Sequence, residues 1–220
     1  SIVFQNFFKF AVPNFAVYYL TGFLIFNFMN EATSSAMVSI VGNAPLIKKV
    51  YIPKYIFPLE KVMFAFVNML FSMITLVIMM GVTKLGIIGS AADLNISWTI
   101  VLFFIPMLYT LVFSLGLGLI LAAVNVYFRD VGHLYSVWTM AWMYLTPIIY
   151  PMDIVEGTWV MNVIRLNPMY YFVTYFRDVV TNGTVPGLKT NLLCMGISLL
   201  FLVLGLWVFK KKQDRFILFI

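Results

Sequence analysis

Long apolar stretches separated by short polar stretches dominate the chain. Five apolar segments occupy roughly residues 14–37, 57–82, 98–124, 131–150 and 191–209. As an α-helix, each has about the length needed to cross the hydrocarbon core of a bilayer, which takes roughly 20 residues. The alternating segments typical of membrane β-barrels are not evident. The pattern therefore predicts an all-α membrane protein, with one transmembrane domain over residues 1–220.

Positive charge gathers in three of the polar stretches. Cytoplasmic loops of membrane proteins collect lysine and arginine, so these stretches and the C-terminus are expected in the cytoplasm. The basic residues concerned are Lys48, Lys49, Lys54, Lys61, Arg129, Lys210, Lys211, Lys212 and Arg215, whereas Lys9, Lys84, Arg165, Arg177 and Lys189 are expected outside. The chain starts in apolar sequence at Ser1, and we expect a sixth span to precede it, with residues 1–12 as its outer end.

The region at about 151–185 is too long for a tight connection and too apolar for a plain loop. Prolines at 147, 151 and 168 break helices, and aromatic residues fill the sequence between them. Short helices that dip into the outer leaflet, shielded by protein, would suit this composition. An ordinary amphipathic surface helix is the alternative.

Composition excludes several classes of protein. The chain is 63% hydrophobic and 10% charged, whereas soluble domains carry roughly 25% charged residues. The net charge of +6 needs no nucleic acid, because short basic loops explain it. The lone Cys194 cannot form an intrachain disulfide, and no metal-binding spacing or phosphate loop occurs. Without a nucleophile, base and orienting group together, the sequence predicts that the chain carries out no covalent chemistry.

Two polar segments are candidates for contact with a partner. The segment at about 43–56 is basic and punctuated by prolines, so it could form a short helix across the membrane face. It would then dock a soluble partner or, alternatively, bind lipid headgroups. In the second segment, Asn125–His133, Arg129 and Asp130 point about 100° apart on a helix and need different partners. A lone His133 indicates neither a metal site nor a catalytic triad.

Aromatic and polar residues inside the apolar segments are candidates for a transport path. Trp138 and Trp142 lie four residues apart on one helix face. An interfacial belt explains aromatic residues at span ends better than these two, which lie in the middle of a span, and a pore lining is the alternative. Tyr144 follows on the same segment. Glu31 is a costly intramembrane carboxylate, which should pair with a lysine or mark a cavity.

Four stretches together resemble one known family, the membrane permeases of ABC-type polysaccharide exporters, which move O-antigen, capsule or teichoic acid. They read "NAPLIKKVYIPKYIFPLEKV", "AAVNVYFRDVGHLYSVWTMAWMYLTPIIYP", "LNPMYYFVTYFRDVV" and "KKKQDRFILFI". In order and spacing they cover the chain from about Phe15 to its end. The "FRDV…TPIIYP" block and the mid-span tryptophans favour this branch over an ABC-type drug or lipid exporter.

The resemblance implies a six-span permease, here without its N-terminal interface helix and most of span one. Two permeases would form a homodimer with the pore between them, in the bacterial cytoplasmic (inner) membrane. Two separate ATP-binding cassette subunits would bind ATP and Mg²⁺, so this chain would hold no cofactor. The substrate would be a lipid-linked glycan. A secondary transporter would instead need intramembrane charge pairs or an inverted repeat, and a membrane enzyme would need a catalytic constellation.

The resemblance also assigns residues by position. We call residues 43–56 the coupling segment and Asn125–His133 the second contact segment. The expected ATPase contacts are Leu46, Ile47, Lys48, Lys49, Val50, Tyr51, Pro53, Lys54, Phe128, Arg129, Asp130 and His133. The expected substrate path comprises Glu31, Trp138, Trp142 and Tyr144. The expected outer gate comprises Pro147, Tyr150, Pro151, Asn167, Pro168, Tyr170, Tyr171, Tyr175 and Arg177.

The pentapeptide "YFRDV" occurs twice, at Tyr127–Val131 and Tyr175–Val179. Its flanking residues differ at the two places, so no repeat is supported. Because a span separates the copies, we expect them on opposite sides of the membrane. The first would contact the ATPase and the second would anchor the exit gate.

Overall fold

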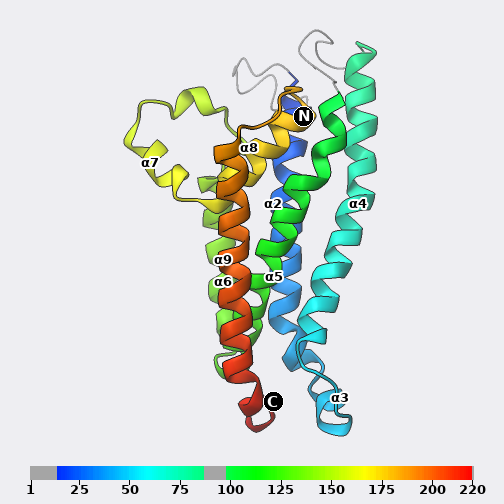
Figure 1. Cartoon of the computed structure of the whole chain (residues 1–220), viewed down its shortest axis with the longest axis vertical. Coiled ribbons are helices and arrows are strands. Elements are labelled where there is room, and N and C mark those ends of the chain that lie inside the picture. Colours follow the sequence, from blue (N-terminus) through cyan, green and yellow to red (C-terminus); the bar gives the residue numbers. More distant parts are fainter. Residues whose placement is uncertain (1–13, 87–97, 220) are drawn as a thin grey trace. The chain divides into compact units, whose positions relative to one another are not determined.

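The computed structural model describes residues 14–86 and 98–219, and within these ranges the chain is helical and contains no strand (Figure 1). Among the described residues, three helical segments are long and apolar enough to cross a membrane: Ile56–Lys84, Trp98–Tyr127 and Leu188–Leu218. The predicted all-α membrane class is therefore confirmed. Residues 1–12, predicted to be the remnant of a lost span, lie outside the described residues.

The long helices lie close to the predicted apolar segments. They are α2 (Phe15–Gly42), α4 (Ile56–Lys84), α5 (Phe104–Tyr127, preceded by the 3-10 helix η2, Trp98–Phe103), α6 (Val131–Leu145) and α9 (Leu188–Lys212). Helix α6 stops five residues before the predicted end of its span, because Pro147 cannot continue a helix. At 15 residues it is about 22 Å long, shorter than a hydrocarbon core of about 30 Å.

Short helices fill the connections. Helix α3 (Ala44–Lys49) lies in the coupling segment, and the 3-10 helix η3 (Met152–Ile154) with α7 (Trp159–Arg165) and α8 (Pro168–Val180) lies between α6 and α9. The 3-10 helix η4 (Gln213–Leu218) follows α9. Short helices were predicted in the outer region. Their entry into the outer leaflet stays a prediction.

The chain divides into two compact units, and the long helices contribute to both. Unit 1 consists of Ser1–Phe26, Leu70–Met107 and Trp142–Cys194, and unit 2 consists of Asn27–Met69, Leu108–Ala141 and Met195–Ile220. All residues expected at the outer gate belong to unit 1. All residues expected to contact the ATPase belong to unit 2.

The centre of unit 1 is α8. Its buried side chains include Met169, Phe172, Val173, Phe176 and Val179. Helix α8 packs against η2 and α7, and the Thr99 hydroxyl donates a hydrogen bond of 3.0 Å to the Val179 carbonyl. The second "YFRDV" copy is therefore part of a buried helix rather than a surface loop.

Unit 2 has an apolar cluster to which five helices and the terminal η4 contribute. Its buried members are Ile40, Ile47, Phe57, Leu119, Ala122, Ala123, Val126, Phe209 and Phe216. In the same unit the backbones of α5 and α9 touch at glycines. A β-carbon on Gly116 would overlap the Phe201 carbonyl group, and one on Gly205 would overlap the Gly116 backbone. Small residues of this kind let membrane helices approach closely.

Candidate functional site

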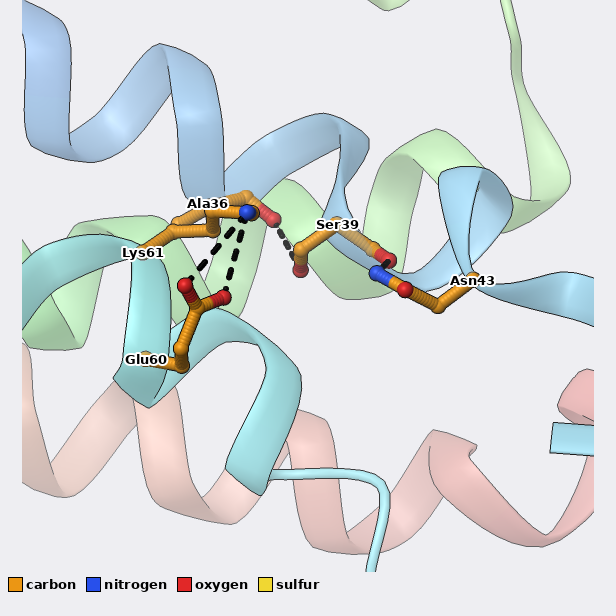
Figure 2. Close-up of polar contacts among 5 residues, drawn as sticks. All are labelled: Ala36, Ser39, Asn43, Glu60 and Lys61. Carbon is orange, nitrogen blue, oxygen red and sulfur yellow. Dashed lines mark hydrogen bonds and ion pairs between the residues drawn. The ribbon is translucent and has the colours of Figure 1, made fainter. Parts of the chain in front are cut away.

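The coupling segment begins where Asn43 closes α2. The Asn43 side-chain amide donates a hydrogen bond of 2.8 Å to the Ser39 carbonyl, and the Ser39 hydroxyl donates one of 2.6 Å to the Ala36 carbonyl (Figure 2). The Ser39 carbonyl also accepts a hydrogen bond of 3.2 Å from the Asn43 backbone amide, so Asn43 binds the last turn of α2 through both its side chain and its backbone. On the first turns of α4, just past the segment, Lys61 pairs with Glu60 at 3.2 Å (Figure 2).

Most side chains of helix α3 are exposed on the surface of the protein. Ile47 is its buried residue, whereas Leu46, Lys48, Lys49 and Val50 are exposed. Tyr51, just after the helix, is fully exposed. This combination of two ammonium groups, an aromatic ring and aliphatic side chains suits contact with a protein that carries acidic and apolar groups.

Lys54 is held differently from the other lysines of the segment. It is half-buried, and its ammonium donates a hydrogen bond of 2.7 Å to the Gln213 carbonyl. The same ammonium lies 5.9 Å from the centre of the Phe216 ring. Lys54 therefore contacts η4 of its own chain, whereas the side chains of Lys48 and Lys49 are exposed.

The second contact segment is also exposed at its tip. Phe128, Arg129, Asp130 and His133 are all exposed. Asp130 starts α6, because its carbonyl accepts hydrogen bonds from the His133 and Leu134 amides at 3.1 and 3.3 Å. The coupling segment and the second contact segment thus both belong to unit 2, and both carry exposed side chains.

Glu31 has an amide partner rather than the expected lysine. The Asn68 side chain on α4 donates a hydrogen bond of 2.8 Å to its carboxylate. Nearby in unit 2, the Thr33 and Tyr135 hydroxyls lie 2.6 Å apart, which joins α2 to α6. Sequence reasoning missed Asn68 and Tyr135, although a polar side chain within each apolar segment was a usable signal.

The three aromatic candidates on α6 differ in their surroundings. Trp138 and Tyr144 are exposed, as a surface for a glycan or for lipid would require. Trp142 is half-buried, and its indole N–H donates a hydrogen bond of 2.6 Å to the Asn167 Oδ1 atom. Trp142 therefore belongs with the polar contacts of the outer region.

Asn167 connects the end of α6 to the start of α8. Its Oδ1 atom accepts hydrogen bonds from the Met169 amide at 2.9 Å and from the Trp142 indole. Its Nδ2 atom donates to the Thr146 hydroxyl at 2.8 Å. As the N-cap of α8 it satisfies one of the open amides of that helix. One buried side chain thus joins two helices and their loop.

Arg177, which was expected on the outer side of the membrane, is buried in unit 1, with only 6% of its surface exposed. Its guanidinium donates hydrogen bonds to the Pro147 carbonyl at 2.6 Å and to the Tyr18 carbonyl at 3.0 Å. It also lies 3.6 Å from the centre of the Tyr18 ring. The bent backbone after α6 and the first turns of α2 are thereby bound to α8.

The charge of Arg177 persists despite its burial. Helix α8 lies outside the segments able to cross a membrane, and burial lowers the pKa of Arg177 to about 10. The guanidinium is therefore still protonated near neutral pH. Burial also raises the pKa of the neighbouring Asp178, which accepts a hydrogen bond of 2.9 Å from Asn182.

Gly22 makes room for the guanidinium. A β-carbon at Gly22 would lie 2.7 Å from the Arg177 Nη2 atom. The missing side chain thus lets the arginine head lie against the α2 backbone. Tyr18 and Gly22 were not predicted, because an apolar pattern does not tell which face of α2 meets a buried cation.

The remaining outer-gate residues form a set of tyrosine contacts in unit 1. The Tyr150 hydroxyl donates to the Tyr144 carbonyl at 3.1 Å, and the Tyr18 hydroxyl donates to the Tyr150 carbonyl at 3.0 Å. The Tyr171 hydroxyl donates to the Arg165 carbonyl at 2.8 Å. Tyr175 is buried, Tyr170 packs edge-on against Tyr171, and Pro151 and Pro168 are partly buried.

Side chains that could bind a metal ion do not cluster in the part of the chain that the structure describes. Among residues 14–86 and 98–219, no group of three or more His, Cys, Asp and Glu side chains lies close enough together to hold a metal ion.

Curated relatives match almost the whole chain. The "O-antigen export system permease protein RfbA" of Klebsiella pneumoniae is 27% identical over 97% of this chain and 79% of its own length. A second Klebsiella pneumoniae protein of the same name is 24% identical over the same shares. The Myxococcus xanthus protein of that name is 25% identical over 93% of this chain and 76% of its own length.

A protein-family model matches most of the chain. The model described as "ABC-2 type transporter" matches residues 1–181, which include the coupling segment, the second contact segment and α8. The chain therefore belongs to the ABC-2 type transporter family.

Proposed function

We propose that the chain is the membrane permease of an ATP-driven exporter that moves a lipid-linked polysaccharide across the bacterial cytoplasmic membrane. The observation that carries this proposal is the match of nearly the whole chain to proteins named as O-antigen export permeases. The helices able to cross a membrane support the same role. Membership of the ABC-2 family implies separate ATP-binding subunits.

In this proposal the chain binds no nucleotide and catalyses no reaction. Two copies would surround the pore, with the C-terminus in the cytoplasm. The ATP-binding subunits would hold ATP and Mg²⁺ and hydrolyse the nucleotide. Their closure would push on the exposed side chains of the coupling segment, with the second contact segment as the other point of contact, and would move the spans as rigid bodies.

Glu31 and Trp138 would be the substrate contacts of unit 2, and Tyr144 would be a substrate contact of unit 1. The exposed rings of Trp138 and Tyr144 offer flat faces on which sugars can stack. Glu31, with its Asn68 partner, would supply a polar group along the path. The outer region, held by Arg177 and Asn167, would form the exit gate. A polar lining of this kind suits a glycan better than an apolar drug.

The test uses the permease purified with its ATP-binding subunits and reconstituted in lipid vesicles. Lipid-linked polysaccharides should stimulate ATP hydrolysis and should be transported, whereas the lipid carrier alone and small apolar drugs should not. Stimulation by a drug or a phospholipid alone would instead identify the alternative, a drug or lipid exporter.

The coupling assignment is tested in the same vesicles. Replacing Lys48, Lys49 and Tyr51 by alanine should abolish transport while basal ATP hydrolysis continues, because the ATPase motion no longer reaches the spans. The matched control replaces Lys84 and Lys189, exposed lysines of unit 1, and should transport normally. Unchanged export by the triple variant would overturn the assignment.

A further inference from the structure

The coupling segment has little of its own to hold it in place. Helix α3 has six residues, and only Ile47 among them is buried. A helix this short is not stable by itself in water, so its position depends on tertiary contacts. Those contacts involve the last part of the chain, because Ile47 shares its apolar cluster with Phe216 of η4.

Phe216 is the fully buried residue of η4. Its ring meets Phe209 of α9 edge-on, with centroids 5.4 Å apart. The Lys54 ammonium lies 5.9 Å from the centre of the same ring and donates a hydrogen bond to the Gln213 carbonyl. Lys54 therefore contacts η4 directly, and Ile47 belongs to the same apolar cluster as Phe216.

The 3-10 helix η4 and the residues beside it also contact Tyr127 in the second contact segment. The Tyr127 hydroxyl donates a hydrogen bond of 3.1 Å to the Lys212 carbonyl, directly before η4. The Tyr127 ring meets Phe216 at 6.1 Å and Phe219 at 4.7 Å between centroids. Tyr127 immediately precedes Phe128, the first exposed residue of that segment.

We infer that η4 is a brace that joins the two ATPase contacts of the permease, with Phe216 as the positioning residue for the coupling segment. The inference rests on the proposed coupling role of α3. Force on α3 would pass through Ile47 and Lys54 to η4, and from η4 through Tyr127 to the end of α5. Phe216 itself would not touch the ATPase, because it is buried.

Amide hydrogen exchange of the full-length permease, without its ATPase, tests the brace directly. The reporters are the amides of Leu46, Ile47 and Val50, which are hydrogen-bonded within the coupling segment, and that of Phe128. Phe216→Ala should accelerate exchange at these amides about tenfold or more, because local opening becomes easier. Amides of α8 in unit 1 should be unaffected.

Two further variants keep the test decisive if Phe216→Ala weakens the whole fold. Phe216→Leu retains most of the apolar volume and should give a smaller acceleration, confined to the same amides. Lys54→Met keeps the aliphatic stem but removes the bond to Gln213, and should loosen the coupling segment without affecting Phe128. Leu218→Ala, at an exposed position of η4, is the control and should change nothing.

Exchange that stays unchanged at the coupling segment in Phe216→Ala would overturn the brace. So would a Phe216→Leu variant whose accelerated exchange is spread evenly over both units. Because exchange requires neither substrate nor ATPase, this readout can fail while polysaccharide export is confirmed, and it can succeed while export fails. In the reconstituted complex, Phe216→Leu should additionally lower transport per ATP hydrolysed, whereas Leu218→Ala should not.

Discussion

The Asn68 side chain on α4 donates a hydrogen bond of 2.8 Å to the carboxylate of Glu31 on α2. Removing this donor should cost about 1 kcal/mol of unfolding free energy, since polar contacts between membrane helices are worth about that much. We expect this loss in Asn68→Leu, measured by chemical unfolding in detergent. Glu31→Gln should cost less, because an amide oxygen still accepts the bond.

The control for this prediction is a double-mutant cycle. Asn68→Leu should have a smaller effect in a Glu31→Leu background, because the shared bond is already lost. Additive effects of the two substitutions would contradict a direct contribution of the Asn68–Glu31 bond.

The absence of a side chain at Gly22 should matter only through Arg177. Gly22→Ala is expected to lower the unfolding free energy by about 1–3 kcal/mol, because the new methyl group displaces the guanidinium. Gly81→Ala, also in a helix of unit 1 but with open space around it, should be neutral or gain up to about 1 kcal/mol. Thermal unfolding of the two purified variants gives the comparison.

An Arg177→Met background provides the second check on Gly22. Without the guanidinium, alanine at position 22 should cost little more than at position 81. A full penalty in that background would mean that the α2 backbone, rather than the arginine, requires glycine.

Arg177 should add no pH dependence to stability in the physiological range. Burial lowers its pKa from the ordinary guanidinium value, which applies to the unfolded chain, to about 10 in the folded one, so well below pH 10 both states keep the proton. Between these two values the unfolded state binds more protons, so this contribution to stability rises with pH only there. The difference in melting temperature between Arg177→Met and the parent should therefore be constant from pH 6 to pH 8. If the difference in melting temperature changed between pH 6 and pH 8, Arg177 would not stay protonated in both the folded and the unfolded state.

Asn167 should be the most sensitive polar residue of the outer region. Asn167→Ala removes the cap of α8 and the bonds to Trp142 and Thr146, at an expected cost of about 2–3 kcal/mol. Asn167→Asp keeps the two acceptor contacts and should cost less. Melting temperatures of the purified permeases measure both.

Trp142→Phe isolates one of these bonds and should cost about 1 kcal/mol. Trp159→Phe, at an exposed position of α7, is its control and should be neutral. Equal losses for the two tryptophans would show that the indole bond to Asn167 contributes nothing specific.

The long helices and the family could be predicted from the sequence. The lengths of the apolar segments indicate the helices, and four motifs in a fixed order indicate the family. The end of α6 was overestimated by five residues because Ile148 and Ile149 keep the apolar pattern running past Pro147. Hydropathy registers an apolar side chain whether or not its backbone is still helical.

The partners of the polar residues were less accessible. Arg177 was expected to anchor the exit gate at the outer side of the membrane, but the sequence could not name its partners, the carbonyl groups freed by the bend after α6, such as that of Pro147. Those carbonyls arise from backbone geometry and leave no mark in the amino-acid pattern. The contact of Lys54 with η4 was missed for a similar reason, since it joins positions 159 residues apart.

The contact of α5 and α9 at Gly116 and Gly205 restricts how the permease can change shape. Where two backbones touch directly, no side chain lies between them that could change rotamer and let one helix slide or turn past the other. The two helices should therefore travel as a single stiff strut through every step of the transport cycle. A pair of spin labels on α5 and α9 beside this contact should report one unchanging separation, with and without ATP.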